Sequence, residues 1–343
     1  MRSLSGTRRG FGSPARTQIL TLGVMLLKKI GHMRQGTLMI VFTLLTISGA
    51  IGQNFEKVVF NDKEADDYYI QLKPPTEKIN GVLVLLPGYG EKAESIFPSS
   101  KLFNTAYANG LLTIAIAGGE KIYADEKVLD KLNRGLTDFI KRNPNVPRDK
   151  FVIGGFSAGG TIGLRYAEYS VENPAKIPVT IKGVFTVDSP VDLGDIWEYF
   201  QREIKKDYSE AGVFEAKFVS EKMSKEIGTP ETNPKQYNEL TPFNHRLTES
   251  GNEKYLKNIA VRVYHDIDVE WQLKQRRRSL FDSNQFSASE LINRLMLMGN
   301  ERAEFMTAKQ PGVRSNGMRH PHSWSIVDEV ECIQWTLKLF DTK

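Results

Sequence analysis

The sequence predicts an α/β fold with a mostly parallel sheet, and two patterns carry this prediction. Short apolar runs rich in β-forming residues alternate along the chain with amphipathic helical stretches, which is typical of βαβ units. One run, residues 81–86 (GVLVLL), is apolar throughout, as expected for a central strand that is covered on both faces. Of the 343 residues, 40% are hydrophobic and 25% are charged, which fits a globular protein.

The strands are expected, in chain order, at residues 58–60, 68–72, 81–86, 111–117, 151–155, 181–187, 259–265 and 303–308. The helices are expected at residues 99–108, 127–142 and 158–171, with a last one around Cys332. Cys332 is the only cysteine, so no intrachain disulfide is possible, and we interpret it as a buried small hydrophobe.

The segment between the sixth and seventh expected strands breaks this alternation. More than 60 residues between Asp192 and Lys257 are mostly charged and helical in pattern. A structureless loop of that length is unusual inside a compact domain. We therefore expect a helical insertion (192–257) over the sheet edge, where it would act as a lid or a substrate wall.

The charge of the chain is unevenly distributed. Residues 1–52 hold seven basic side chains and no acidic one, which accounts for the net charge of +5. Residues 53–343 carry 39 basic and 41 acidic side chains, so we expect no nucleic-acid partner.

Residues 33–52 have the order of a signal peptide: a basic start at Met33-Arg34, an uncharged apolar stretch, and small residues up to Gly52. Cleavage is expected before Gln53, with cleavage after Ala50 as the alternative. The apolar stretch, 37–47, is short for a membrane span, which needs about 20 residues. An uncleaved anchor is the alternative interpretation.

Residues 1–32 do not fit the layout of a signal peptide. We interpret them as a mis-annotated or disordered leader upstream of translation from Met33, with a genuine long leader as the alternative. The mature chain, 53–343, is expected to form a single domain that is periplasmic or secreted. No stable membrane association is expected after cleavage of the signal.

The strongest chemical signal is the pentapeptide 155–159 (GFSAG), which lies between an expected strand and an expected helix. It matches G-x-S-x-G in the strand–turn–helix context of a nucleophilic serine. The turn is sharp, so the residues that flank Ser157 must be small, as Gly155, Ala158 and Gly159 are. The partial positive charge of the helix N-terminus favours a developing anion. We therefore predict that Ser157 is the nucleophile.

Stabilisation of an oxyanion beside Ser157 requires backbone N–H donors. Ala158, which follows the nucleophile, is expected to supply one, and the loop after the third strand the other. That loop reads 87–90 (PGYG), and Tyr89 is the expected donor because the glycines let the backbone approach closely.

The serine needs a base, and the base needs an orienting carboxylate; both follow the serine in the order acid, then histidine. A late loop carries His320 and His322; we favour His322 and keep His320 as the alternative. His265 ends the seventh strand and is expected to pack or to hydrogen-bond locally.

The acid is expected directly after the seventh strand, in residues 265–271 (HDIDVEW). We choose Asp268, because it lies farther into the loop and Trp271 can anchor that loop. Asp266 remains an alternative, as do Asp188 and Asp192 after the sixth strand. No metal or cofactor is expected, since the chain has no HExxH, EF-hand, Walker or dinucleotide-binding pattern.

Four segments in order, 85–90 (LLPGYG), 151–160 (FVIGGFSAGG), 261–268 (VRVYHDID) and 320–324 (HPHSW), resemble the α/β-hydrolase superfamily. The resemblance covers roughly residues 58–340 and is strongest to secreted bacterial esterases of the acetyl-xylan, feruloyl and polyester-cleaving types. It implies an eight-stranded sheet with an antiparallel second strand and helices on both faces. It also implies attack by Ser157, proton transfer through His322, orientation by Asp268, and an acyl-enzyme that water clears.

Two segments depart from the family pattern. Pro87-Gly88 stands where many relatives have His-Gly, and H-D-I-D stands where relatives often have H-G-x-x-D. The second departure keeps Asp266 in competition with Asp268. The expected function is that of an exported carboxylester hydrolase acting on a small-molecule or acylated carbohydrate ester. A serine peptidase of the same fold and a binding protein that lost catalysis are the alternatives.

Overall fold

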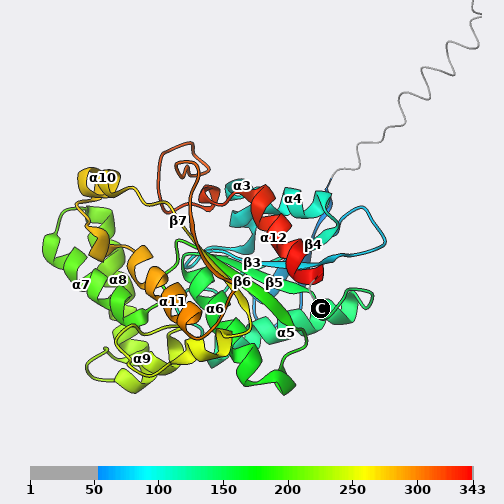
Figure 1. Ribbon diagram of the computed structural model, residues 1–343, viewed down its shortest axis with the longest axis horizontal. Coiled ribbons are helices and arrows are strands. Elements are labelled where there is room, and N and C mark those ends of the chain that lie inside the picture. The colour runs from blue at the N-terminus through cyan, green and yellow to red at the C-terminus, as the bar shows by residue number, and fades with distance from the viewer. Residues whose placement is uncertain (1–52, 342–343) are drawn as a thin grey trace, which may run out of the picture. The chain divides into compact units, whose positions relative to one another are not determined.

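The computed structural model describes residues 53–341 (Figure 1). The leader (1–32) and the signal peptide (33–52) expected from the sequence lie outside the described residues. Within the described range, no helix has both the length and the apolar character needed to cross a membrane.

The described chain forms an eight-stranded sheet with the order β1-β2-β4-β3-β5-β6-β7-β8. β2 is antiparallel to both of its neighbours, and the pairs from β4 to β8 are all parallel, so the expected sheet is confirmed. The strands are β1 (Phe55–Val59), β2 (Tyr68–Leu72), β3 (Gly81–Leu86), β4 (Leu111–Ile116), β5 (Phe151–Phe156), β6 (Ile181–Val187), β7 (Ala260–His265) and β8 (Ala303–Thr307).

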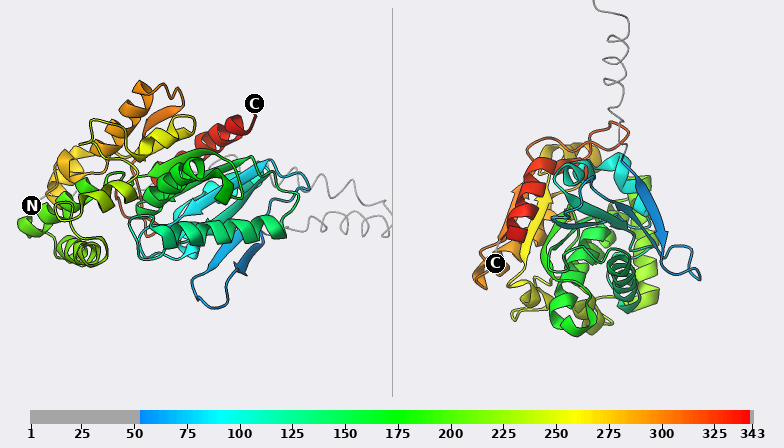
Figure 2. Two further views of the ribbon diagram at one scale, coloured as in Figure 1. Left: turned by 90° about the horizontal axis from the view of Figure 1, so that it is seen from below. Right: turned by 90° about the vertical axis from the view of Figure 1, so that its right-hand side faces the viewer.

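Helices cover both faces of this sheet, and β3 shows why its sequence is apolar throughout. Val84 belongs to a core that includes residues of α5 (Glu126–Arg142), α6 (Ala158–Glu172) and α11 (Gln285–Leu297). Its neighbours Leu83 and Leu85 point to the other face. There they pack into a second core with α4 (Leu102–Ala108) and α12 (Glu329–Asp341). Figure 2 shows α12, drawn in red, on the side of the sheet opposite α5.

The insertion after the sixth strand is helical, as expected. It contains α7 (Leu193–Lys206), α8 (Glu210–Ile227) and α9 (Pro234–Leu240), and α7 and α8 lie side by side (Figure 1). Phe200, Val219 and Met223 from these helices form a third core with Ala158 at the start of α6. The insertion is therefore packed directly against the turn that carries Ser157.

A further excursion, 266–284, follows β7 and was not predicted from the sequence. It contains α10 (Val269–Trp271), the π-helical turn η4 (Gln272–Arg276) and the turn η5 (Leu280–Asp282). Arg278 donates two hydrogen bonds of 3.1 Å to Glu203, and Arg202 donates one of 2.8 Å to Asp282. These ion pairs join the excursion to α7 of the insertion.

The remaining short helical elements are α3 (Ile96–Ser99), η1 (Ala93–Ser95), η2 (Pro174–Lys176), η3 (Asn252–Leu256) and η6 (Trp324–Ile326). The parallel strands β3, β5, β6 and β7 all end at the same edge of the sheet. Ligands of open α/β sheets bind at this edge, outside the carboxyl ends of the strands. The loops that leave it here carry the PGYG segment, Ser157, Asp188 and the HDID segment.

Candidate active site

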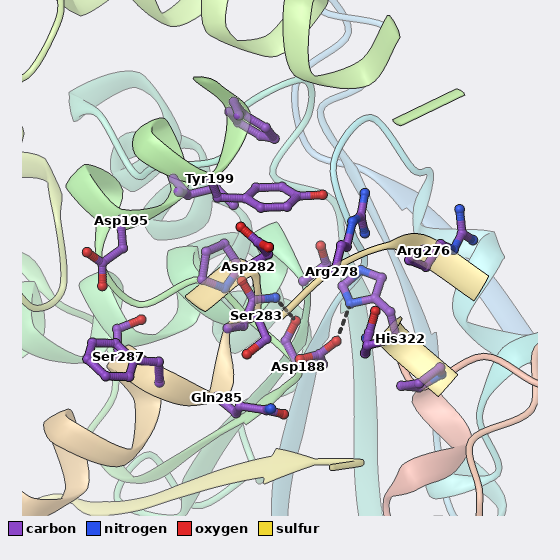
Figure 3. A pocket seen from close by; sticks show the side chains of 18 of the residues that line it. Asp188, Asp195, Tyr199, Arg276, Arg278, Asp282, Ser283, Gln285, Ser287 and His322 are labelled. Carbon is purple, nitrogen blue, oxygen red and sulfur yellow. Dashed lines mark hydrogen bonds and ion pairs between the residues drawn. The ribbon is translucent and has the colours of Figure 1, made fainter. Parts of the chain in front are cut away.

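A pocket of about 550 Å³ opens at the carboxyl edge of the sheet. The residues that line it include Ser157, Asp188 and His322, together with Tyr89 and Ala158. The other walls come from α7 and α8 of the insertion and from the excursion 266–284 (Figure 3). Its size is within the usual range for small-molecule sites, about 300–1,000 Å³.

Ser157 occupies the strained turn that the sequence predicted. Its φ of 53° and ψ of −126° lie outside the regions that L-residues prefer. The glycines around it are needed for the close approach of backbone to backbone. A Cβ on Gly155 would lie 2.3 Å from the carbonyl carbon of Gly159, and one on Gly159 would lie 2.3 Å from the carbonyl oxygen of Pro87. The G-x-S-x-G pattern is therefore explained by packing of the turn itself.

The two residues expected to supply N–H donors both line this pocket. Within the described chain, neither Tyr89 nor Ala158 donates its backbone N–H to a hydrogen bond. The loop around Tyr89 is held by Glu91, whose carboxylate accepts a hydrogen bond of 2.9 Å from the Gly88 N–H. This role of Glu91 was not predicted from the sequence, although the residue directly follows the PGYG segment.

His322 lies in the same pocket and is oriented by a carboxylate. Its Nδ1 lies 2.7 Å from Oδ2 of Asp188, an interaction that Figure 3 draws as a dashed line. In the described part of the chain, its Nε2 has no hydrogen-bond partner, and none joins His322 to the Ser157 hydroxyl. In unliganded active sites such bonds are often long and tighten only when substrate is bound.

Asp188 follows β6 directly and has a left-handed φ of 44°. Its N–H bonds to the carbonyl of Tyr264 at 2.9 Å, which fixes it between β6 and β7. Its second carboxylate oxygen lies 3.0 Å from Nδ1 of His265, a fully buried ring that stacks on Phe305. Burial opposes ionisation of Asp188, but the hydrogen bonds from His265 and His322 outweigh it and bring its pKa well below the ordinary value.

The structure places Asp268 elsewhere, which corrects the expectation that it lies behind His322. Asp268 accepts a hydrogen bond of 2.9 Å from the N–H of Trp271 and forms an ion pair of 2.8 Å with Arg319. Asp266 pairs with the same arginine at 2.8 Å and accepts from the Gly312 N–H at 2.7 Å. Both carboxylates thus tie the excursion to the loop before His322 rather than orient its ring.

Asp192 and His320, which the sequence also offered as acid and base, are held in structural contacts. Asp192 caps the N-terminus of α7, where its Oδ1 accepts from the N–H groups of Gly194 and Asp195. Burial, together with the charges of Arg314, His322 and Arg276, lowers the pKa of His320 to about 3. Its Nδ1 lies 3.1 Å from the backbone N of His322, as suits a residue that supports the loop.

One group in the described chain has the composition of a metal site: Asp192, Asp195 and His245 have ligand atoms within 4.8 Å of one another. Asp192 Oδ2 already accepts from the N–H and from the ring Nδ1 of His245 at 3.0 and 2.9 Å. Because these hydrogen bonds and the helix cap use both oxygens of Asp192, they account for the cluster without an ion.

No protein-family model matches the chain, and no curated protein matches it. Several solved structures are similar to this chain. Carboxyl esterase 2 from the fungus Tuber melanosporum is similar at a TM-score of 0.55 and 12% identity, over 85% of this chain and 89% of that one. Esterase B from Lactobacillus rhamnosis HN001 is similar at a TM-score of 0.51 and 10% identity, over 95% of this chain and 96% of that one.

The acylaminoacyl peptidase of Pyrococcus horikoshii matches over 84% of this chain at a TM-score of 0.46 and 14% identity. This chain spans only 41% of the length of that peptidase. At such low identities the comparisons with the two esterases establish the fold, and the fold is that of the α/β-hydrolases.

Proposed function

We propose that this protein is a serine hydrolase that cleaves carboxylic esters. Ser157 is the nucleophile, His322 the base, and Asp188, in the place expected for Asp268, orients the base. The observation that carries the proposal is that Ser157, at its strained turn, lines the same pocket as His322, whose Nδ1 lies 2.7 Å from Oδ2 of Asp188.

In the first step the Ser157 Oγ attacks the carbonyl carbon of the ester, and its proton passes to Nε2 of His322. The carbonyl oxygen becomes an oxyanion, which accepts hydrogen bonds from the free N–H groups of Tyr89 and Ala158. The imidazolium that forms is stabilised by Asp188, whose lowered pKa keeps it a carboxylate.

The bond to the alcohol oxygen then breaks, and His322 returns its proton to the leaving alcohol. The acyl group remains on Ser157. Water attacks this acyl-enzyme in the same way: it gives one proton to His322, the acid departs, and the proton returns to the Ser157 oxygen. The products are one carboxylic acid and one alcohol.

We also propose that the enzyme is exported and acts on a small-molecule or acylated carbohydrate ester. The size of the pocket suits a small molecule. Export rests on the signal-peptide pattern of residues 33–52. Expression of the full chain in a Gram-negative host, followed by fractionation and N-terminal sequencing, should give a periplasmic or secreted form that begins at Gln53 or Ile51.

The catalytic proposal is tested with Ser157→Ala. Hydrolysis of p-nitrophenyl acetate should fall by a factor of at least about a thousand, because loss of the serine nucleophile of such a triad lowers kcat by about a millionfold. A fluorophosphonate probe should label the wild-type protein and not the variant. Unchanged hydrolysis by folded Ser157→Ala would refute the mechanism. Cleavage of aminoacyl-coumarins but not of esters would favour a peptidase. If the fluorophosphonate probe does not label the folded protein and the protein still binds a ligand, a non-catalytic binding protein is favoured.

A further inference from the structure

The arginines of the pocket differ in whether a carboxylate neutralises them. Five arginines line it: Arg202, Arg246, Arg276, Arg278 and Arg314. Three have acidic partners, since Arg202 pairs with Asp282 at 2.8 Å, Arg246 with Glu198 at 2.6 Å and Arg278 with Glu203 at 3.1 Å. In the part of the chain that the structure describes, Arg276 and Arg314 pair with no carboxylate.

Arg276 ends the π-helical turn η4 and is half-buried. Its guanidinium carbon lies 5.7 Å from the centre of the Trp271 ring, which supports the planar group from one side. Burial and the nearby charges of Arg278 and Arg314 lower its pKa. Figure 3 shows Arg276 and Arg278 on the His322 side of the pocket. The guanidinium is thus held in place without an ion-pair partner of its own in the described range, and the carboxylate whose charge acts on it, Glu203, is paired with Arg278.

The one hydrogen-bond partner of the Arg276 guanidinium among the described residues is a poor one. Its Nη2 lies 2.8 Å from Nε2 of His320, while Nδ1 of His320 lies 3.1 Å from the backbone N of His322. A neutral imidazole has a single acceptor nitrogen, yet both of its neighbours here are donors. Protonation would worsen the mismatch, because it removes the remaining acceptor. One donor is therefore always unmatched.

Arg314 also lines the pocket and belongs to the loop that precedes His320. A tight turn fixes its backbone, with its N–H bonded to the Met318 carbonyl at 2.9 Å and its carbonyl accepting from Gly317 at 2.8 Å. Its side chain is exposed and, in the described range, has no hydrogen-bond or ion-pair partner. Arg314 and Arg276 both line the pocket, and the charge of Arg314 acts on Arg276 as well as on His320.

We propose that Arg276 and Arg314 form a subsite for a carboxylate that the ester substrate carries. This inference rests on the proposed function. Guanidinium groups bind carboxylates through paired N–H donors, and Arg276 is already oriented by Trp271. A carboxylate supplies the acceptors that His320 cannot, and it neutralises the charge of guanidinium groups that have no ion-pair partner in the described chain. The substrate class is then an acidic ester, with its anion on either the acyl or the alcohol side.

Matched substrate pairs test the subsite. On the acyl side, mono-4-nitrophenyl succinate is compared with 4-nitrophenyl butyrate; on the alcohol side, 4-acetoxybenzoate is compared with its methyl ester. The wild-type enzyme should prefer the acidic ester of at least one pair by about tenfold or more in kcat/KM, as expected for hydrogen bonds to a charged group. The pair that shows the preference locates the subsite relative to the scissile bond.

Arg276→Gln and Arg314→Gln should each reduce this preference, with the larger loss in Arg276→Gln because exposed Arg314 is more strongly screened. Arg276→Lys, which keeps the charge but loses the fork of donors, should fall in between. Lys274→Gln is the control. It removes one positive charge from the same turn, but Lys274 is exposed, pairs with Glu270 and does not line the pocket, so the preference should be unchanged.

Two results overturn the inference, and they differ from failure of the proposed function. If both neutral esters are hydrolysed through Ser157 without preference for either acidic partner, the function stands and the subsite is refuted. If no ester is hydrolysed, the function fails, and the subsite is judged by calorimetric titration with succinate and 4-hydroxybenzoate. Binding of either acid that is at least about fivefold weaker to Arg276→Gln than to the wild-type protein supports the subsite. No binding to the wild-type protein, or equal binding to the wild type and the variant, refutes it.

Discussion

Replacement of Asp188 by Asn tests which carboxylate orients His322. The two oxygens of Asp188 each accept from a histidine Nδ1, at 2.7 Å from His322 and 3.0 Å from His265. Asn keeps the shape of the side chain but turns one of these acceptors into an NH₂ donor. One histidine then loses its partner, and in either orientation the negative charge that stabilises a protonated His322 is gone.

The size of the loss follows from the geometry. With the charges of the imidazolium and the carboxylate about 4 Å apart and an effective dielectric constant of about 20, their attraction is about 4 kcal/mol. If the transition state loses that amount, kcat falls by roughly a thousandfold. The assay is steady-state hydrolysis of p-nitrophenyl acetate, with circular dichroism and thermal unfolding to establish that Asp188→Asn is folded.

Asp268→Asn is the matched control. Asp268 makes a partly exposed ion pair with Arg319, so its loss should destabilise the fold by at most about 1 kcal/mol and leave kcat within a few fold. Should Asp268→Asn reduce kcat more than Asp188→Asn does, the placement of the acid after β6 is refuted, and Asp268 becomes the orienting carboxylate.

Three further predictions concern the same framework. Gly159→Ala puts a methyl group about 2.3 Å from a backbone carbonyl oxygen, so kcat should drop at least about a hundredfold, and a kcat within threefold of wild type would contradict the packing argument. His265→Phe keeps a buried aromatic ring but removes one hydrogen bond to the acid, and we expect about a tenfold lower kcat with stability changed by about 1 kcal/mol. Burial opposes ionisation of Asp282, but its basic partners lower its pKa to about 2. Its stabilising effect is therefore complete above pH ~4 and is lost as the pH falls toward 2, which amounts to about 1 kcal/mol between pH 5 and pH 3. Other acids with a lowered pKa, such as Asp188, lose stabilising effect over the same range, so the loss of unfolding free energy between these pH values, measured with urea, should be about 1 kcal/mol smaller in Asp282→Asn than in wild type.

The fold and the turn at Ser157 could be predicted because their signals are local. β3 is apolar at every position since both of its faces are covered, and the glycines around Ser157 are required by contacts within a few residues or with the adjacent PGYG loop. Such constraints leave a direct trace in the sequence. The placement of Tyr89, Ala158 and His322 on one pocket with Ser157 follows from strand order alone.

The acid could not be chosen from the sequence, because β6 and β7 are neighbours and an aspartate follows each of them. The features that favour Asp188, the acid that we propose, come from the tertiary structure: a left-handed φ, a backbone hydrogen bond to Tyr264 and the position of His265. Asp268 is removed from competition by Arg319, a residue 51 positions away in sequence. The cationic part of the pocket was missed for the same reason, since only the fold shows which arginines lack acidic partners.

The ion pairs between α7 and the excursion 266–284 bear on how substrates reach Ser157. The carboxylates of Glu203 and Asp282 are each only 2% exposed and pair with arginines of the opposite wall, so these ion pairs hold the two walls together. We therefore expect the mouth of the pocket to keep its shape, so that substrates of the proposed hydrolase are selected by shape on entry, before any chemistry begins.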